Sequence, residues 1–278
     1  MQISIEDFYE DIIDKAQSGL GLNDVEVVNR AGISKNELEI AKSGEFREQV
    51  ARALAPILNL DANSLVEAGL KAWYPDPINI NGLLAFNTPF PVPGYAEMTV
   101  NAYLVWDKGT KKSVIFDTGG DATKLLQSVQ ELDLSVDLIL LTHTHGDHIA
   151  DLERVGRECG NPPIRVHKNE TARGAEGIEE GAKFSVGSLK IEALLTHGHS
   201  PGGTTYIVSG LERPIAIVGD SLFANSMGGA SGFHQQALGN NRDKILSLPD
   251  NTAICPGHGP MTTVSEEKAH NPFHPEFK

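Results

Sequence analysis

The stretch THTHGDHIA, at positions 142–150, places three histidines and one aspartate within six residues, directly after the apolar run VDLILL. Imidazole and carboxylate groups are common protein ligands of zinc, iron and manganese. Because the chain turns at the end of a strand, His143 and His145 can converge on one point beyond the sheet. The glycine that follows permits a tight turn, which can direct Asp147 and His148 to a second point nearby. The spacing therefore predicts metal binding at the mouth of a strand.

This cluster alone does not close a metal site, because such ions take four or more donors and a catalytic ion keeps one position for water. Three later motifs supply further donors: His199 in LLTHGHSPGGT, Asp220 in IAIVGDSLF and His258 in TAICPGHGP. Each of these donors follows an apolar run and has a glycine beside it. A carboxylate at the position of Asp220 can bridge two ions.

The ordered set THTHGDH, HGHSPG, GDSLF and PGHGP resembles the metallo-β-lactamase superfamily and, within it, the glyoxalase II-type hydrolases. The resemblance covers about residues 80–278 and implies an α/β fold, an αββα sandwich with a two-metal site at one edge of two sheets. The ligands that it implies are His143, His145 and His199 for one metal, Asp147, His148 and His258 for the other, and Asp220 as the bridge. It also implies that Asp117, in the turn Asp-Thr-Gly, accepts a hydrogen bond from a ligating histidine.

Two further histidines are candidates for the substrate pocket. The family commonly has Pro-Gly-His where this chain has His197-Gly198-His199, so His197 is an added imidazole beside the metal. It either lines the substrate pocket or has a solvated or structural role. His234 lies in the Gly-rich insertion SMGGASGFHQQALGNN, which we expect to overhang the site, and such insertions often carry substrate contacts.

The resemblance implies hydrolysis by a hydroxide held between two divalent ions, of which zinc is favoured and iron or manganese are the alternatives. Two ions would lower the pKa of a shared water from about 15.7 towards neutrality. Asp147 and Asp220 would act in catalysis, the first by orienting this nucleophile and the second by bridging the ions. The expected substrate is a small molecule with a thioester or another activated acyl bond. A persulfide dioxygenase with a single iron is the alternative enzyme on this fold.

The elements that must position these donors are short strands. Eight runs are rich in β-branched residues and bounded by Gly, Pro, Asp or Asn, which is typical of strands. These runs are MTVNAYLVW, SVIFDTGG, VDLILLTH, PIRVH, LKIEALLTH, TTYIVSG, PIAIVGD and TAICPGH. Helical patterns such as DATKLLQSVQEL and NRDKILSLP lie between some of them, so the sequence predicts an α/β sheet protein in residues 83–278.

Residues 1–72 show only helical patterns, and the prolines and glycine of residues 73–82 predict a linker. Apolar side chains recur on one face in Ile5–Ala16 and in Phe46–Ile57, so we expect a bundle of about five helices. The stretch LNDVEVVNRAGISKNELEIAKSGEF resembles the small helix-turn-helix domain of the Cro/repressor type. The recognition helix would be 34–43.

DNA binding requires Lys and Arg to neutralise phosphates, but residues 1–72 carry 7 basic and 13 acidic side chains. Glu37 and Glu39 lie on the expected recognition helix. We therefore expect this domain to dock on the catalytic domain or to form a homodimer. A metal-dependent sensor fused to a DNA-binding domain is the alternative reading.

The formal charge of −14 over 278 residues disfavours general binding to nucleic acid or to anionic membranes. The acidic start MQISIEDFYEDIID lacks the features of a signal peptide, and no apolar run is long enough to span a bilayer, so we expect a cytoplasmic protein. Cys159 and Cys255 are too few for a disulfide framework and are expected to be reduced thiols.

Overall fold

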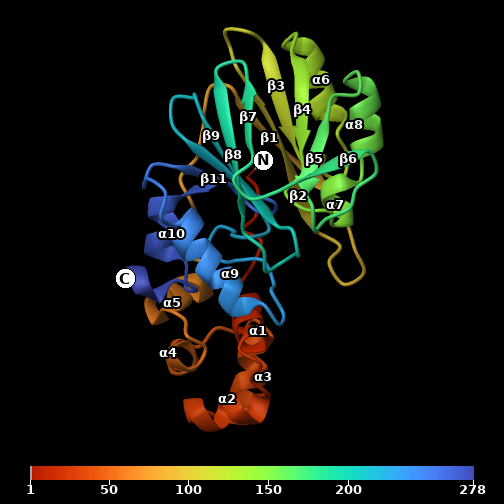
Figure 1. The fold of residues 1–278 in the computed structure, drawn as a ribbon. Helices are drawn as coiled ribbons and strands as arrows, with labels where there is room; N and C mark the ends of the chain where they lie inside the picture. Colours follow the sequence, from red (N-terminus) through yellow and green to blue (C-terminus); the bar gives the residue numbers. More distant parts are fainter. Residues whose placement is uncertain (1) are drawn as a thin grey trace.

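The computed structural model describes residues 2–278, and its larger part consists of two six-stranded sheets that pack face to face (Figure 1). The first sheet has the order β1-β2-β3-β4-β5-β6 and the second has the order β12-β11-β10-β9-β8-β7. The strands of the first sheet are β1 Leu83–Pro89, β2 Thr99–Trp106, β3 Lys112–Phe116, β4 Ser135–Leu140, β5 Ile164–His167 and β6 Ala175–Ile178. Those of the second are β7 Lys183–Val186, β8 Leu189–Leu195, β9 Thr204–Ser209, β10 Ile215–Gly219, β11 Ala253–Pro256 and β12 Thr262–Thr263.

Helices cover the outer face of each sheet and complete the αββα order that the sequence predicts. Side chains of α6 (Thr123–Glu131) and α8 (Leu152–Glu158) pack on the first sheet. The π-helical turn η1 (Asn241–Ile245) and α10 (Val264–His270) pack on the second. The shorter elements are α7 Gly146–Ile149, α9 His234–Asn240 and the 3-10 turn η2 Pro275–Phe277.

Strand β4 shows why the apolar runs form buried strands. Leu138 and Leu140 point into the core between the sheets, while Ile139 and Leu141 point into the core under α6 and α8. Successive side chains of a strand face opposite sides, so a strand that is covered on both faces must be apolar at nearly every position. The run VDLILL meets this requirement and ends two residues before His143.

Four strands lie outside the eight runs that the sequence predicts, namely β1, β6, β7 and β12. All four are edge strands of the two sheets. Edge strands are only partly buried, as the mostly half-buried residues of β1 and the exposed residues of β6 show. Their sequences therefore lack the apolar pattern by which the inner strands are recognised.

Five helices precede the sheets, as the composition of residues 1–72 predicts. They are α1 Tyr9–Gly19, α2 Asp24–Ala31, α3 Lys35–Lys42, α4 Glu48–Ile57 and α5 Ala62–Leu70. The side chains of Ser34 and Asp61 accept hydrogen bonds from the first turns of α3 and α5, which explains where these helices begin. Gly32, with a φ of 66°, ends α2 and permits the turn between α2 and α3.

The helical region packs directly on the α/β part, and Figure 1 shows α5 and α1 beside α10 and α9. Its apolar core includes four side chains from the α/β part: Met227, Ala230, Ala237 and Phe273. The backbone N–H of Asp61 also donates to the carbonyl of Pro272 at 2.8 Å. The expected linker therefore lies between α5 and β1, while one hydrophobic core extends over both parts.

No helix within residues 2–278 has both the length and the apolar composition that a membrane span requires. Both cysteines are free thiols, and Cys255 is buried in the core between the sheets.

Candidate metal centre

All the candidate ligands stand at one edge of the two sheets, because the strands before them run in the same direction. Strands β10 and β11 are parallel, and β8 and β10 are both antiparallel to β9 and hence parallel to each other. Strand β4 is parallel to β3 in the other sheet. The first donor follows the end of each of β4, β8, β10 and β11 by one to four residues, and the last donor after β4, His148, follows it by eight.

The donors form two groups, each of which has the size of a metal site. The ligand atoms within each group lie within 4.8 Å of one another. The first group, which we call the open group, is His143, His145, His199 and Asp220; the second, the buried group, is Asp147, His148 and His258. The structure thus brings together all seven donors of the sequence analysis, in the two sets that the resemblance implies.

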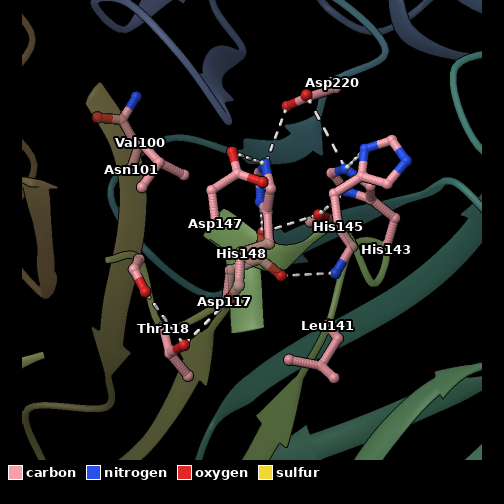
Figure 2. Close-up of polar contacts among 12 residues, drawn as sticks. Val100, Asn101, Asp117, Thr118, Leu141, His143, His145, Asp147, His148 and Asp220 are labelled. Carbon is pink, nitrogen blue, oxygen red and sulfur yellow. Dashed lines mark hydrogen bonds and ion pairs between the residues drawn. The ribbon is translucent and has the colours of Figure 1, made fainter. Parts of the chain in front are cut away.

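Asp220 lies between the two groups, and Figure 2 shows its carboxylate facing the ring nitrogens below it. Its Oδ2 lies 3.3 Å from Nε2 of His199 and 3.3 Å from Nε2 of His258. Its Oδ1 lies 3.2 Å from Nε2 of His148. Oδ2 thus lies near a histidine of each group and Oδ1 lies near the buried group, so this carboxylate is placed as a bridging ligand would be.

Two buried atoms at the centre, Nε2 of His148 and Oδ1 of Asp220, face each other at 3.2 Å, and neither forms a hydrogen bond with the described residues. Burying a polar atom without a partner costs roughly 1–3 kcal/mol, so such atoms are rare in folded proteins. A cation bound between these atoms would satisfy both of them. The donor set therefore fits divalent metal ions.

Two of the donors, Asp220 and His143, are held in the ionisation states that metal ligands need. Burial would raise the pKa of Asp220, but the adjacent His258 and His148 hold it well below its usual range, so Asp220 is a carboxylate. Burial, with the nearby His148, lowers the pKa of His143 well below its usual range, so His143 is a neutral imidazole. Ionised carboxylates and neutral imidazoles are the forms that bind divalent metals. Burial would lower the pKa of His148 and His258, but the nearby carboxylates raise it, to about 10 for His148, so a metal ion would have to displace a proton from each.

Asp117 positions the buried group, as the sequence predicts for it. Its Oδ2 accepts the hydrogen bond of His148 Nδ1 at 2.9 Å and that of the Thr142 hydroxyl at 2.7 Å (Figure 2). Its Oδ1 accepts the backbone N–H of Thr142 at 2.7 Å. Because Nδ1 of His148 donates to Asp117, Nε2 is left to face Asp220. Asp117 adopts a φ of 55°, a left-handed conformation that aspartate tolerates better than most residues.

His258 and His199 are oriented by backbone carbonyls. Nδ1 of His258 donates to the carbonyl of Thr99, at the start of β2, over 2.6 Å. Nδ1 of His199 donates to the carbonyl of Gly229 over 2.9 Å. Each bond fixes the tautomer and leaves Nε2 free to face the centre.

Glu170 connects the two loops that carry the open group, and sequence reasoning missed it. Its Oε2 accepts the hydroxyl of Thr144, within the first histidine motif, at 2.5 Å. Its Oε1 accepts the backbone N–H of Gly202, three residues after His199, at 2.8 Å. Glu170 is a lone glutamate between β5 and β6, distant in sequence from both motifs, so no local pattern indicates this contact.

Glu6 is a second carboxylate near the centre that the sequence does not reveal. Its Oε2 lies 4.0 Å from Nδ1 of His258, and its backbone lies against Gly259. Glu6 stands more than 130 residues before the first donor motif in the sequence. Its position is therefore a result of the docking of the N-terminal segment onto the α/β part.

The two candidates for the substrate pocket have different surroundings. His197 is half-buried and belongs to neither donor group, and its carbonyl accepts the side-chain amide of Asn240 at 2.8 Å. His234 is buried against Gly19 of α1, and its ring centre lies 6.1 Å from that of Phe273. Its ring thus packs between the α/β part and the helical region and has little surface left for a substrate. The structure does not support the role that the sequence suggested for His234.

Comparisons with known proteins agree with this geometry. The family model described as "Metallo-beta-lactamase superfamily" matches residues 96–258. The chain is 35% identical over 184 residues to the probable metallo-hydrolase YqgX of Bacillus subtilis, a match that covers 58% of this chain and 86% of the relative. It is 30% identical over 197 residues to the hydroxyacylglutathione hydrolase GloC of Haemophilus influenzae, covering 62% and 92%.

Among solved structures, the BLEG-1 B3 metallo-beta-lactamase superposes with a TM-score of 0.59 at 30% identity. That match covers 69% of this chain and 99% of the solved chain. The residues matched by the family model include all seven donors of the two groups. The chain belongs to the metallo-beta-lactamase superfamily.

Proposed function

We propose that this protein is a hydrolase that uses two divalent metal ions to cleave a thioester or another activated acyl bond of a small molecule. The observation that carries the proposal is the position of Asp220, with Oδ2 3.3 Å from a histidine of each donor group. One carboxylate that serves both groups favours two ions acting together over a single ion. When bound, such a pair of ions supplies a hydroxide nucleophile at neutral pH and a Lewis acid for the substrate carbonyl.

The residues of the chain have separate roles in this proposal. His143, His145 and His199 bind one ion, and Asp147, His148 and His258 bind the other, with Asp220 shared. Asp147 is buried, and its Oδ2 lies 3.3 Å from Nε2 of His258. We assign it a second role, which is to accept a hydrogen bond from the attacking water and so orient it. Asp117 holds His148 in the tautomer that binding requires.

The acyl substrate is supported by similarity to the GloC relative, whose name describes a hydroxyacylglutathione hydrolase. Zinc is the metal we favour. The donors are imidazoles and carboxylates without thiolate, a set that suits zinc and that iron and manganese also accept. A substrate-pocket role for His197 remains part of the proposal, since its ring is half-buried beside a ligand loop.

The experiment is metal analysis of protein that was purified without added metal, together with assays on S-lactoylglutathione, simpler acyl thioesters and glutathione persulfide. We expect about two ions per chain and hydrolysis of a thioester. One iron per chain together with oxygen consumption on the persulfide would contradict the hydrolase and identify a dioxygenase.

We further propose that the helical region does not bind DNA, although α2 and α3 occupy the positions expected for a helix-turn-helix. Glu39 is exposed and Glu37 is half-buried on α3, where phosphate contacts would require basic side chains. A gel-shift assay at physiological salt should therefore show no tight, sequence-dependent binding. Such binding would overturn this proposal and favour a sensor.

A further inference from the structure

The loop between β10 and α9, residues 220–233, touches the open group through two glycines. A side chain at Gly228 would place its Cβ 1.9 Å from the carbonyl oxygen of Asp220 and 3.0 Å from Nδ1 of His199. The backbone therefore passes too close to both ligands for any residue but glycine. The next carbonyl, of Gly229, accepts the hydrogen bond of His199 Nδ1. The position of this backbone thus sets the orientation of the His199 ring.

The residues just before these glycines are held by the helical region. The hydroxyl of Ser226, which is fully buried, donates to Oδ2 of Asp7 at 2.6 Å. The same Oδ2 forms an ion pair with Lys15 of α1. The ammonium of Lys15 also donates to the carbonyl of Met227 at 3.0 Å. Asp7 and Lys15 thus bind both residues that precede Gly228.

The contact extends towards the buried group through an aromatic ring. Nζ of Lys15 lies 5.0 Å from the ring centre of Phe223, and that ring lies 5.6 Å from the ring of His258, edge to face. Phe223 and Ser226 are joined by two backbone hydrogen bonds, at 3.0 and 3.1 Å, which make the segment a tight turn. A displacement of Ser226 would therefore also move Phe223, whose ring contacts His258.

Apolar contacts anchor the same loop. Met227 and Ala230 are buried in the hydrophobic core of the helical region, together with residues such as Ile12 and Leu65. Their side chains leave the loop on either side of the two glycines. The helical region thus holds this segment by two hydrogen bonds, one from the Ser226 hydroxyl to Asp7 and one from Lys15 to the Met227 carbonyl, and by two buried side chains.

Another pair joins the helical region to the α/β part without reaching this loop. Nδ1 of His270 in α10 lies 2.7 Å from Oε2 of Glu67 in α5. Among residues 2–278, neither side chain forms a hydrogen bond, an ion pair or a ring contact with residues 220–233. The pair therefore contributes to docking alone and supplies a matched control.

We propose that the helical region is a structural part of the metal centre, in which Asp7 and Lys15 are positioning residues that hold the Ser226–Gly229 backbone against His199. The inference goes beyond the hydrolase activity, because it concerns the affinity for metal and not the bond that is cleaved. It assigns the helical region a role that neither DNA binding nor dimer formation requires.

The test uses the full-length protein and titration with Co²⁺, whose visible absorption reports the ligand geometry. One variant is Ser226→Ala, which removes a single hydroxyl. The second is the double variant Asp7→Asn with Lys15→Met, because removing both charges avoids leaving an unpaired buried charge that would unfold the protein. We expect both variants to bind cobalt at the open group about 10- to 100-fold more weakly, with an altered absorption band.

The control variant is Glu67→Gln, compared after its thermal stability has been measured beside the others. It should bind cobalt with wild-type affinity and spectrum, even where it lowers the melting temperature. Wild-type cobalt binding by Ser226→Ala and by the double variant would show that the proposal is wrong. An equal loss of affinity in Glu67→Gln would also contradict it, because general docking would then account for the effect. No substrate is involved, so a failure here is distinguishable from a failure of the proposed hydrolysis.

Discussion

The open group and the buried group use the same kinds of donors, but they differ in exposure to solvent. His145 is exposed, and the side chain of His199 keeps 22% of its surface accessible. In the buried group, His148 has no accessible surface, and Asp147 and His258 are also buried. In the proposed mechanism a substrate would therefore approach on the side of the open group, while the buried group would hold the second ion inside the fold.

The two groups also differ in the elements that hold them. The partners of the buried group are Asp117, directly after β3, and the carbonyl of Thr99 in β2. The open group depends on Glu170 and Gly229, which both lie in loops. Sheet residues are packed on two faces, whereas loops open at lower free-energy cost. The open group is therefore the part of the centre in which small changes in sequence can alter binding.

Substitution of the shared ligand tests whether the two groups form one centre, and its effect should be the largest. In Asp220→Ala we expect the affinity for both ions to fall. Hydrolysis should fall by more than about a hundredfold, which exceeds the usual effect of losing a residue that only hydrogen-bonds to a ligand. The measurements are metal stoichiometry and kcat/KM. Asp137→Ala, which removes a carboxylate of β4 that pairs with Lys112, is the control. Retention of both ions and of activity in Asp220→Ala would show that Asp220 is not a bridge.

Asp117→Asn should affect the buried group most, because Asp117 contacts His148 directly and reaches His143 only through the hydroxyl of Thr142. Asparagine tolerates the φ of 55° at this position, so the backbone is preserved while the charge facing His148 is lost. We expect about 10- to 100-fold weaker metal binding at the buried group, with the open group retained. Sequential titration with Co²⁺ measures the two affinities separately. An equal loss at both groups would remove the distinction between them.

Glu170→Ala should affect the open group alone and by a smaller factor. The variant releases the Thr144 loop from the Gly202 loop, so the histidines that they carry lose a shared support. We expect metal binding there to weaken by about tenfold, at the lower end of the range for outer partners. Glu170→Gln should restore binding, because its amide oxygen accepts from Gly202 and its N–H₂ can donate to the Thr144 hydroxyl. If Glu170→Gln binds metal as weakly as Glu170→Ala, the contact of Glu170 with the two loops is not the cause.

Glu267 lies in neither group, and its effect should appear only in stability. It is fully buried; burial raises its pKa from 4.5 to about 7, although hydrogen bonds from Asn271, Thr262 and Asn225 oppose this shift. The folded state therefore keeps a proton that the unfolded chain has lost, and the stability from this group declines as the pH rises from 4.5 to about 7. The decline corresponds to roughly 3 kcal/mol at most.

The variant that isolates this contribution is Glu267→Gln, which keeps the shape and the hydrogen-bond acceptor. We expect its free energy of unfolding, measured with urea between pH 5 and 8, to decline less with pH than that of the wild type. Parallel pH profiles for the two proteins would contradict the assignment. Metal stoichiometry should be the same in both, since the glutamine oxygen can still accept the backbone N–H of Asn225 and so keep the loop before Ser226 in place.

Most of the inner fold could be predicted, because strands that are buried on both faces need continuous apolar runs. The edge strands β1 and β6 could not, since half-exposed strands have no such pattern. For His234, the sequence pattern suggested a substrate contact that the structure does not support. Its place in a Gly-rich insertion indicated a substrate contact, but the helical region covers it through Gly19. Packing between segments that are far apart in the sequence leaves no signal in either one.

The sequence by itself determined the seven donors and their order, because each stands in a short motif that contains a glycine and comes after a strand that its own apolar run identifies. Only the tertiary structure decided which donors are open and which are buried, and that Asp220 lies between them. It also decided that Glu170 joins two of the loops that carry the open group, and that Asp7 and Lys15 contact the loop beside His199. The physical reason is that ligand types are a local property of the chain, whereas exposure and support depend on which distant segments pack beside it.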